Sequence, residues 1–224
     1  MSLQAAEIHE LIETCNAAEI ERRRDYHQYL VERGDQSETF EEHLEKFAMI
    51  VRTGETATPA EIRDLEGAIG RPLPPELAEL YTTIGRLIGL SPRGQLEIPS
   101  VRRLLQRMKD PSVPAYEKLC SLGLADMMRA PWGNERPELD PENGTVSAEG
   151  LEAINQAYTC IGWIRNDPGE EGHTYVYFDR DGRFGTVFYH QDDLEEICES
   201  GLLSWVEQNP ERQTLSEILI GFLR

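Results

Sequence analysis

The sequence lacks a long apolar segment, and this absence excludes a class of protein. No run of about 18 apolar residues occurs, so a membrane-spanning helix of the usual length is excluded. The first residues show no basic region followed by an apolar stretch, so we expect no secretory signal. Together these absences favour a cytoplasmic protein.

Cysteines are few and follow no recognisable spacing. The four are Cys15, Cys120, Cys160 and Cys198. We expect buried free thiols in a reducing cytoplasm, neither disulfides nor a zinc site. The sequence also lacks the His-Glu-x-x-His, Gly-x-Ser-x-Gly and phosphate-loop motifs, and any paired Cys and His arrangement. It therefore predicts no catalytic residue, no cofactor and no enzyme.

Basic residues are scarce relative to acids. The chain has 22 Lys and Arg against 41 Asp and Glu, for a net charge of −19. The excess is uneven: it is −7 over residues 1–57 and −12 over 134–200, whereas 58–110 carries +1. Such a chain repels nucleic acid and anionic lipid, and it attracts a basic protein. The alternative interpretation is that the charge provides solubility alone.

The residues that are present predict a helical extension over residues 1–57. A helix is expected over 4–33 and ends at Gly34. Its apolar stripe starts with Ile8, Leu11, Ile12 and Cys15, fades through Glu19–Asp25 and resumes with Tyr26, Tyr29 and Leu30. Ser37 is expected to cap a second helix that carries Phe40, Leu44, Phe47 and Val51 and ends at Gly54. Arg22, Arg23 and Arg24 are the only basic cluster in this acidic setting, so we expect them to pair with neighbouring acids. The other charges of the extension are expected to form mainly a solvated outer face.

The clearest local pattern lies in residues 58–84. Thr58 and Glu61 fit a capping box, with Pro59 at the first helical position. Gly70 then ends this helix, and a second helix starts at Pro74-Pro75-Glu76. The stretch predicts two short helices joined at a tight corner in which Leu73 is buried.

The rest of the chain mixes helices with a cluster of strands. Helices are expected over 100–109 (capped by Ser100), 115–129, from Ser147 through Ile154, from Asp192-Asp193 onward, and at 215–223, and strands at 96–98, 158–164, 173–178 and 184–189. Asp181-Gly182 is a hairpin turn, and 130–146 is a loop rich in Pro and Gly. This order predicts an α+β fold with a mostly antiparallel sheet.

Several of these stretches resemble the SMI1/KNR4 family, also called the SUKH superfamily. The resemblance rests on Glu61–Glu66, Gly70 and Leu73–Leu77, on the strand-like runs Tyr158–Trp163, Gly172–Asp179 and Gly185–His190, and on Thr214–Leu219. It implies a SUKH-type domain over 58–224, with a loop insertion near 130–146, preceded by the helical extension.

The resemblance also implies a function. Bacterial SUKH proteins are largely immunity proteins that bind and neutralise a toxin domain, often a nuclease. A nuclease toxin is basic because it binds phosphate, so the charge of −19 agrees with this implication. Fungal members resemble regulatory scaffolds, which is an alternative function for the same fold. Either way, the expected partner is a protein, and the chain itself is expected to be a monomer or a homodimer.

The acids between 134 and 200 are the candidates for the partner-binding face. We expect this face to contain Asp167, Glu170, Glu171, Asp192 and Asp193. The alternative is that these acids merely solvate a turn and cap a helix.

Two histidines leave a third hypothesis open. His173, Asp179, His190 and Asp192 have ligand side chains at strand ends and could gather around a metal, which would suit a metal-dependent enzyme using His173 and His190. No second element supplies ligands at a known spacing, so the sequence favours no metal.

Overall fold

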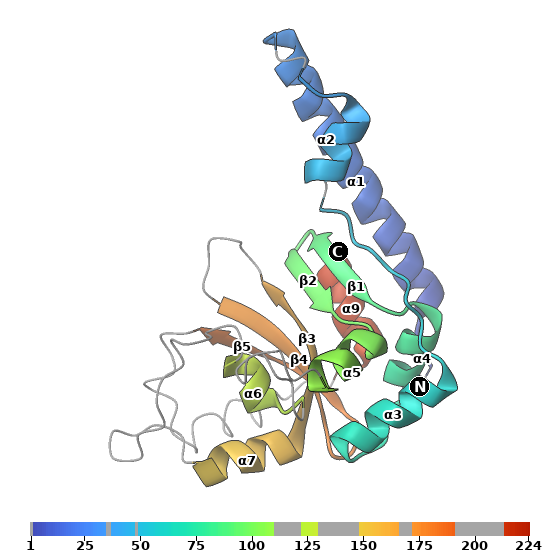
Figure 1. Cartoon of the computed structure of the whole chain (residues 1–224), viewed down its shortest axis with the longest axis vertical. Coiled ribbons are helices and arrows are strands. Elements are labelled where there is room, and N and C mark those ends of the chain that lie inside the picture. The colour runs from blue at the N-terminus through green and yellow to red at the C-terminus, as the bar shows by residue number, and fades with distance from the viewer. Residues whose placement is uncertain are drawn as a thin grey trace.

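A computed structural model describes residues 2–34, 37–47, 49–109, 122–129, 148–165, 172–190 and 213–224. They form, in chain order, α1 (Ala5–Glu32), α2 (Phe40–Phe47), α3 (Pro59–Ile69), α4 (Pro75–Thr83), β1 (Leu87–Ser91), β2 (Gly94–Ile98), α5 (Val101–Lys109), α6 (Leu124–Arg129), α7 (Ala148–Ala157), β3 (Tyr158–Arg165), β4 (Gly172–Asp179), β5 (Phe184–His190) and α9 (Leu215–Leu223) (Figure 1). The predicted α+β class with an antiparallel sheet is confirmed.

The five strands lie in the order in which they occur in the chain. Each pairs antiparallel with the next, from β1 at one edge to β5 at the other. The hairpin between β4 and β5 turns at Asp179–Arg183, where Gly182 has a φ of 74°. This turn is the one that Asp181-Gly182 predicted.

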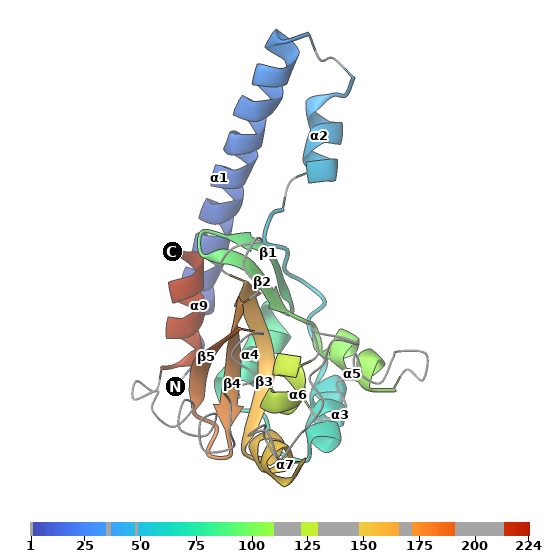
Figure 2. The same ribbon diagram turned by 90° about the vertical axis from the view of Figure 1, so that its left-hand side faces the viewer.

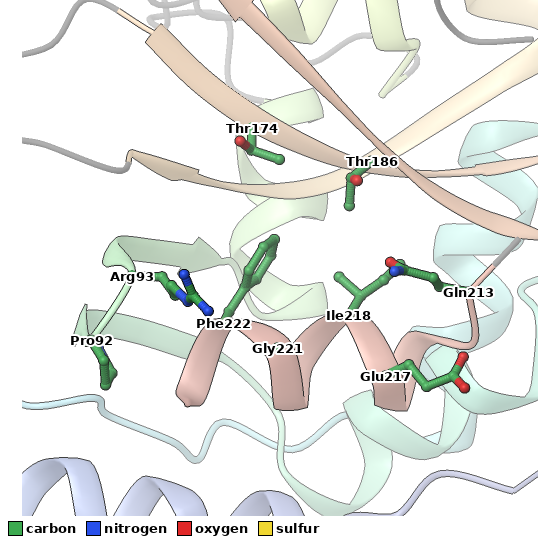
Figure 3. Close-up of a pocket in the computed structure, with 9 residues that line it drawn as sticks. All are labelled: Pro92, Arg93, Thr174, Thr186, Gln213, Glu217, Ile218, Gly221 and Phe222. Atoms are coloured by element: carbon green, nitrogen blue, oxygen red, sulfur yellow. The ribbon is translucent and has the colours of Figure 1, made fainter. Parts of the chain in front are cut away.

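Helices cover both faces of the sheet. On one face Tyr175 of β4 is buried, and its hydroxyl donates to the Met128 carbonyl of α6 at 3.4 Å. On the other face Thr174 and Thr186 lie opposite Ile218 of α9 (Figure 3). The core therefore lies on both sides of β4, where the successive residues Tyr175 and Val176 point to opposite faces and are both fully buried.

The corner between α3 and α4 forms as its residues predict. Thr58 and Glu61 make both bonds of a capping box, and Gly70 takes the left-handed conformation with a φ of 72°. The side chain of Glu66 accepts the N–H of Leu73 at 2.9 Å, which ties the corner together. Leu73 is buried, as expected.

Residues 49–57, which we call the strap, run along the outer edge of β1. Arg52 and Ile88 exchange both backbone hydrogen bonds, at 2.8 and 3.1 Å, and the N–H of Arg86 donates to the Gly54 carbonyl at 2.9 Å. The sequence prediction here is wrong: α2 ends at Phe47, so Val51 is not helical. Val51 has a spacing that suits a helix, but the backbone hydrogen bonds between its neighbour Arg52 and β1 hold this segment in an extended conformation.

The strap reaches β1 because glycine lies at the crossing. A Cβ on Gly85 would stand 2.0 Å from the Gly54 carbonyl oxygen, and the φ of Gly85 is 82°. Just beyond, Glu55 also has a positive φ, of 56°. Its carboxylate accepts the hydroxyl of Ser100 at 2.6 Å and pairs with Arg86, and the Ser100 bond lowers its pKa. These contacts stabilise the strained turn.

The first half of α1 packs on α9, at the opposite end of the chain. Leu3, Ile8 and Ile12 are buried in the common core, and the thiol of Cys15 donates to the Leu223 carbonyl at 3.0 Å. Asn16 then exchanges two hydrogen bonds with the backbone of Val51 in the strap, at 2.9 and 2.7 Å. The helical extension is therefore attached to the core of the remaining chain through α9 and the strap.

The second half of α1 projects away from the sheet, with α2 beside it (Figure 2). The whole helix has 28 residues, which corresponds to about 42 Å. We call residues 17–34 and 37–47 the arm. The predicted hairpin exists, although the cap of α2 is Thr39 with Glu42 and not Ser37.

Alanine at Gly85 should destabilise the fold. It would place a Cβ against the strap and force a positive φ on a side-chain residue, so we expect a loss of about 2 kcal/mol or more in the free energy of unfolding. Urea denaturation measures it. Gly67→Ala is the matched control, because Gly67 lies inside α3 with open space around it and should gain about 0.5–1 kcal/mol. Equal effects at the two sites would contradict the strap's close approach.

Candidate protein-binding surface

The five acids predicted for the partner-binding face lie outside the described residues. They are Asp167, Glu170, Glu171, Asp192 and Asp193. The described residues beside them are neighbours, since Gly172 pairs with His190 and Ile164 pairs with Thr174. The end of β3, the start of β4 and the end of β5 thus meet at one end of the sheet. In sequence, three of the acids fall between β3 and β4, and two directly follow β5.

The structure separates the groups considered for a metal site. Within the register, His173 pairs with Tyr189, and His190 pairs with Gly172, so the two histidines are not cross-strand partners. Asp179 lies six positions from His173 on β4, which is about 20 Å along a strand. A shared site for His173 and Asp179 is therefore wrong. Asp192 lies outside the described residues. Within the described ranges, no three His, Cys, Asp or Glu side chains could hold a metal together.

Asp179 has a local role at the turn. Its carboxylate accepts the backbone N–H groups of Asp181 and Arg183, each at 2.9 Å, and pairs with the Arg183 side chain at 2.7 Å. These contacts hold the hairpin turn closed.

His173 is a half-buried, neutral histidine. Burial lowers its pKa from 6.5 to about 4, and the nearby positive charge of Arg165 lowers it further. The ring lies 5.9 Å from that of Tyr175, between centroids. A neutral imidazole at physiological pH is expected for a packed side chain.

The two described cysteines are free, as predicted. Cys160 is fully buried, and its burial raises its pKa to about 12. Burial also raises the pKa of the half-buried Cys15. Neither thiol is therefore an activated nucleophile at neutral pH. Cys120 and Cys198 lie outside the described residues.

The arginine cluster of α1 neutralises acids on its own helix. Arg22 and Arg23 hold the buried carboxylate of Glu19 at 2.7 and 2.8 Å, and Arg24 pairs with Glu21. Burial alone would raise the pKa of Glu19, but hydrogen bonds from the two arginines outweigh it and lower that pKa. The predicted local pairing is confirmed.

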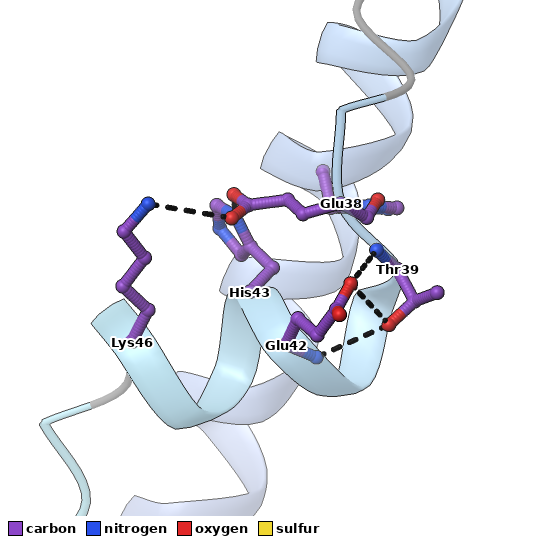
Figure 4. A network of polar contacts seen from close by, with 6 residues as sticks. Glu38, Thr39, Glu42, His43 and Lys46 are labelled. Carbon is purple, nitrogen blue, oxygen red and sulfur yellow. Dashed lines mark hydrogen bonds and ion pairs between the residues drawn. The ribbon is translucent and has the colours of Figure 1, made fainter.

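The start of α2 carries a compact polar network (Figure 4). Thr39 and Glu42 form a capping box, with the Thr39 N–H donating at 2.7 Å, and this bond lowers the pKa of Glu42. Glu38 accepts from His43 at 3.0 Å and lies 3.6 Å from the Lys46 ammonium group. These acids are therefore engaged within the arm.

Two further acids on α2 point into solvent. Glu41 and Glu45 are exposed and lie one helical turn apart, and neither has an ion pair among the described residues. Like charges at this spacing cost a helix about 0.2–0.5 kcal/mol, so they do not help α2 to form. In the sequence they belong to the solvated face of the extension, and nothing there distinguishes them from its other acids.

A cavity of about 540 Å³ opens between α9 and the sheet (Figure 3). It runs along α9 from Gln213 to Phe222. Thr174 and Thr186 lie on its sheet side and Arg93 lies near one end. Glu217, near the other end, is engaged in the capping box with Thr214, whose N–H lowers its pKa. The lining mixes polar side chains with Pro92, Ile218 and Phe222, and it contains no pair of reactive groups.

No family model, curated protein or solved structure matches this chain. The SUKH resemblance therefore stays a prediction. Within the described part of the chain, no helix is long and apolar enough to cross a bilayer.

His173 should make stability pH-dependent. Its folded pKa lies below its unfolded value, so its contribution is complete above pH 6.5 and is lost as pH falls toward about 4. The wild type should lose free energy of unfolding between pH 7.5 and pH 5, and in His173→Gln this loss should be smaller by about 1 kcal/mol. The value is discounted because the ring is partly exposed. Urea midpoints at the two pH values measure it. His9→Gln, at an exposed position, is the control and should change nothing; an unchanged pH dependence in His173→Gln would refute the neutral, packed imidazole.

Proposed function

We propose that this chain is a non-enzymatic binding protein that recognises a basic protein partner through its acidic surface. The observation that carries the proposal is uncompensated charge: 41 acids face 22 basic residues, and exposed carboxylates such as Glu41 and Glu45 have no ion pair within the described residues. Such a surface raises the rate of encounter with a basic partner and repels nucleic acid.

The partner that best suits this surface is a toxin domain that acts on nucleic acid. A domain of this kind needs a basic groove to bind phosphate, and carboxylates can occupy that groove in place of phosphates. The SUKH resemblance supports the same function, that of an immunity protein. The toxin would be neutralised in the cytoplasm by occlusion, without a cofactor or a chemical step.

The proposed contact residues are Asp167, Glu170, Glu171, Asp192 and Asp193. The described residues next to them support one common face, because β3, β4 and β5 meet at the same end of the sheet. The five acids follow or precede, in the sequence, strands that end side by side, and the proposal is that they act as one electrostatic patch.

Capture at two salt concentrations tests the function itself. The full chain is immobilised on a resin and incubated with lysate of the source organism, once at low salt and once at high salt. Proteins that elute are identified by mass spectrometry. We expect one basic protein that is retained at low salt and lost at high salt. Capture of no specific basic protein would contradict the proposal.

Charge reversal tests the proposed face. Glu170→Lys combined with Glu171→Lys should slow association with the captured partner about tenfold at low salt and flatten its salt dependence. Stopped-flow or surface binding kinetics measure both. Glu10→Lys with Glu13→Lys changes the net charge equally on exposed positions of α1, and should keep most of the wild-type rate. Equal slowing in both variants would show that net charge, and not this face, controls the encounter.

A further inference from the structure

The arm has almost no core of its own. Beyond Glu19, α1 has no buried residue, and between Ile12 and Val51 no described apolar side chain is buried. The arm nevertheless carries many apolar side chains, which are Ile20, Tyr26, Tyr29, Leu30, Val31, Phe40 and Leu44. Helices in proteins gain most of their stability by burying such a face, so this arm leaves much of that stabilisation unrealised.

Contacts between α1 and α2 use one side of the arm. His27 lies 5.7 Å from Phe40 and 5.4 Å from His43, between ring centroids, and Arg24 stacks over Phe40 at 5.4 Å. The eight residues of α2 are fewer than the roughly 12–15 that a helix needs to persist alone in water. Tertiary contacts must therefore stabilise α2.

Beside these contacts, α1 carries an ordered stripe of tyrosine and arginine, and Tyr26 lies at its edge toward α2, with its ring centroid 5.9 Å from that of His43. Arg22, Tyr26, Tyr29 and Arg33 follow each other at i, i+4, i+7 and i+11, which places them on one face. Tyr26 and Tyr29 are 51% and 46% exposed, yet their rings stack at 6.3 Å. The Arg33 guanidinium lies 4.7 Å from the Tyr29 ring centroid.

This composition is typical of a protein interface. Tyrosine and arginine are the residues that most often dominate binding energy, whereas ordinary solvent-facing helix surfaces have Lys and Glu. The mutual stacking also orders the side chains before any partner arrives, which reduces the entropy lost on binding. The stripe therefore has both the chemistry and the order of a docking surface.

The distribution of charge selects the partner. Arg33 lies at one end of the stripe, and at the other end Arg22 and Arg23 share the single charge of Glu19, whereas α2 exposes Glu41 and Glu45, so one arm carries surfaces of both signs. A purely basic partner would meet the arginines, and a purely acidic one would meet the glutamates. A second copy related by a two-fold axis can present each surface to its complement, because an isologous interface makes every contact twice.

We propose that the chain forms a homodimer in which two arms pack side by side, with the stripe of each α1 against α2 of the other copy. The pairing gives a four-helix arrangement that buries Tyr26 and Tyr29 and covers the exposed side of α2, on which Glu41 and Glu45 lie. This proposal is independent of the proposed function, since it uses the arm alone.

Sedimentation velocity on the full chain tests the dimer across low to high micromolar concentrations. The wild type should be a dimer at high concentration, and Tyr26→Lys with Tyr29→Lys should be a monomer. The far-UV circular dichroism of this variant should match that of the wild type. Glu10→Lys with Glu13→Lys, on the part of α1 that packs on α9, should dimerise as the wild type does. A wild type that stays monomeric at every concentration would overturn the proposal.

A charge exchange tests the specific pairing. Glu41→Lys with Glu45→Lys, and separately Arg22→Glu with Arg33→Glu, should each weaken self-association at least tenfold, because each variant opposes like charges. Mixing the two variants should restore dimers, since α1 of each again meets α2 of opposite sign. Circular dichroism checks that loss of the Arg22–Glu19 pair leaves α1 folded. This arrangement would be excluded if each charge variant alone dimerised as the wild type does, or if mixing the two variants produced no more dimer. The tyrosine variant still tests the dimer if a charge variant fails to fold.

Discussion

The pairing of the strap with the edge of β1 is the constraint on which the remaining structure depends. It covers an edge that would otherwise expose a row of backbone groups, and such edges invite pairing with other chains. It also carries the chain from the arm to the α3–α4 corner. Asn16 attaches α1 to this strap at Val51, so the projection of the arm depends on the same contact. Gly85 makes that close approach possible.

Local signals in the sequence predicted local structure well. The capping box at Thr58, the left-handed Gly70 and the turn at Gly182 depend on neighbours within a few positions, and all three form as expected. The antiparallel sheet followed from strand-like runs separated by turn residues, and this prediction is also confirmed. Short-range chemistry dominates at these positions, so a single sequence contains the necessary information.

Long-range contacts decided the features that the sequence did not reveal. Val51 fits the helical spacing of Phe40, Leu44 and Phe47, but hydrogen bonds with Asn16 and the neighbouring strand remove it from α2. The stripe of Tyr26 and Tyr29 escaped notice for a related reason. Tyr26 and Tyr29 fit the apolar helical spacing of α1, and only the three-dimensional positions of α2 and the body show that both side chains stay about half exposed.

The acidic composition is divided by the structure into two kinds of carboxylate. Some perform structural work, such as Glu19 under two arginines, Glu66 at the corner and Glu42 in its capping box. Others, such as Glu41 and Glu45, have no such role within the described residues. The net charge of the sequence includes both kinds, because it does not record which acids are already paired. The second kind is the one relevant to a partner.

The packing of α1 on α9 also bears on how the chain folds during synthesis. The hydrogen bond from Gln4 to Ser216 joins positions 212 residues apart. The buried face of α1 therefore cannot pack until α9, which is synthesised much later, has left the ribosome. Until then Ile8 and Ile12 stay exposed on a nascent chain. High sequence separation of this kind slows folding, and it makes closure of the body a late event that depends on nearly all of the chain.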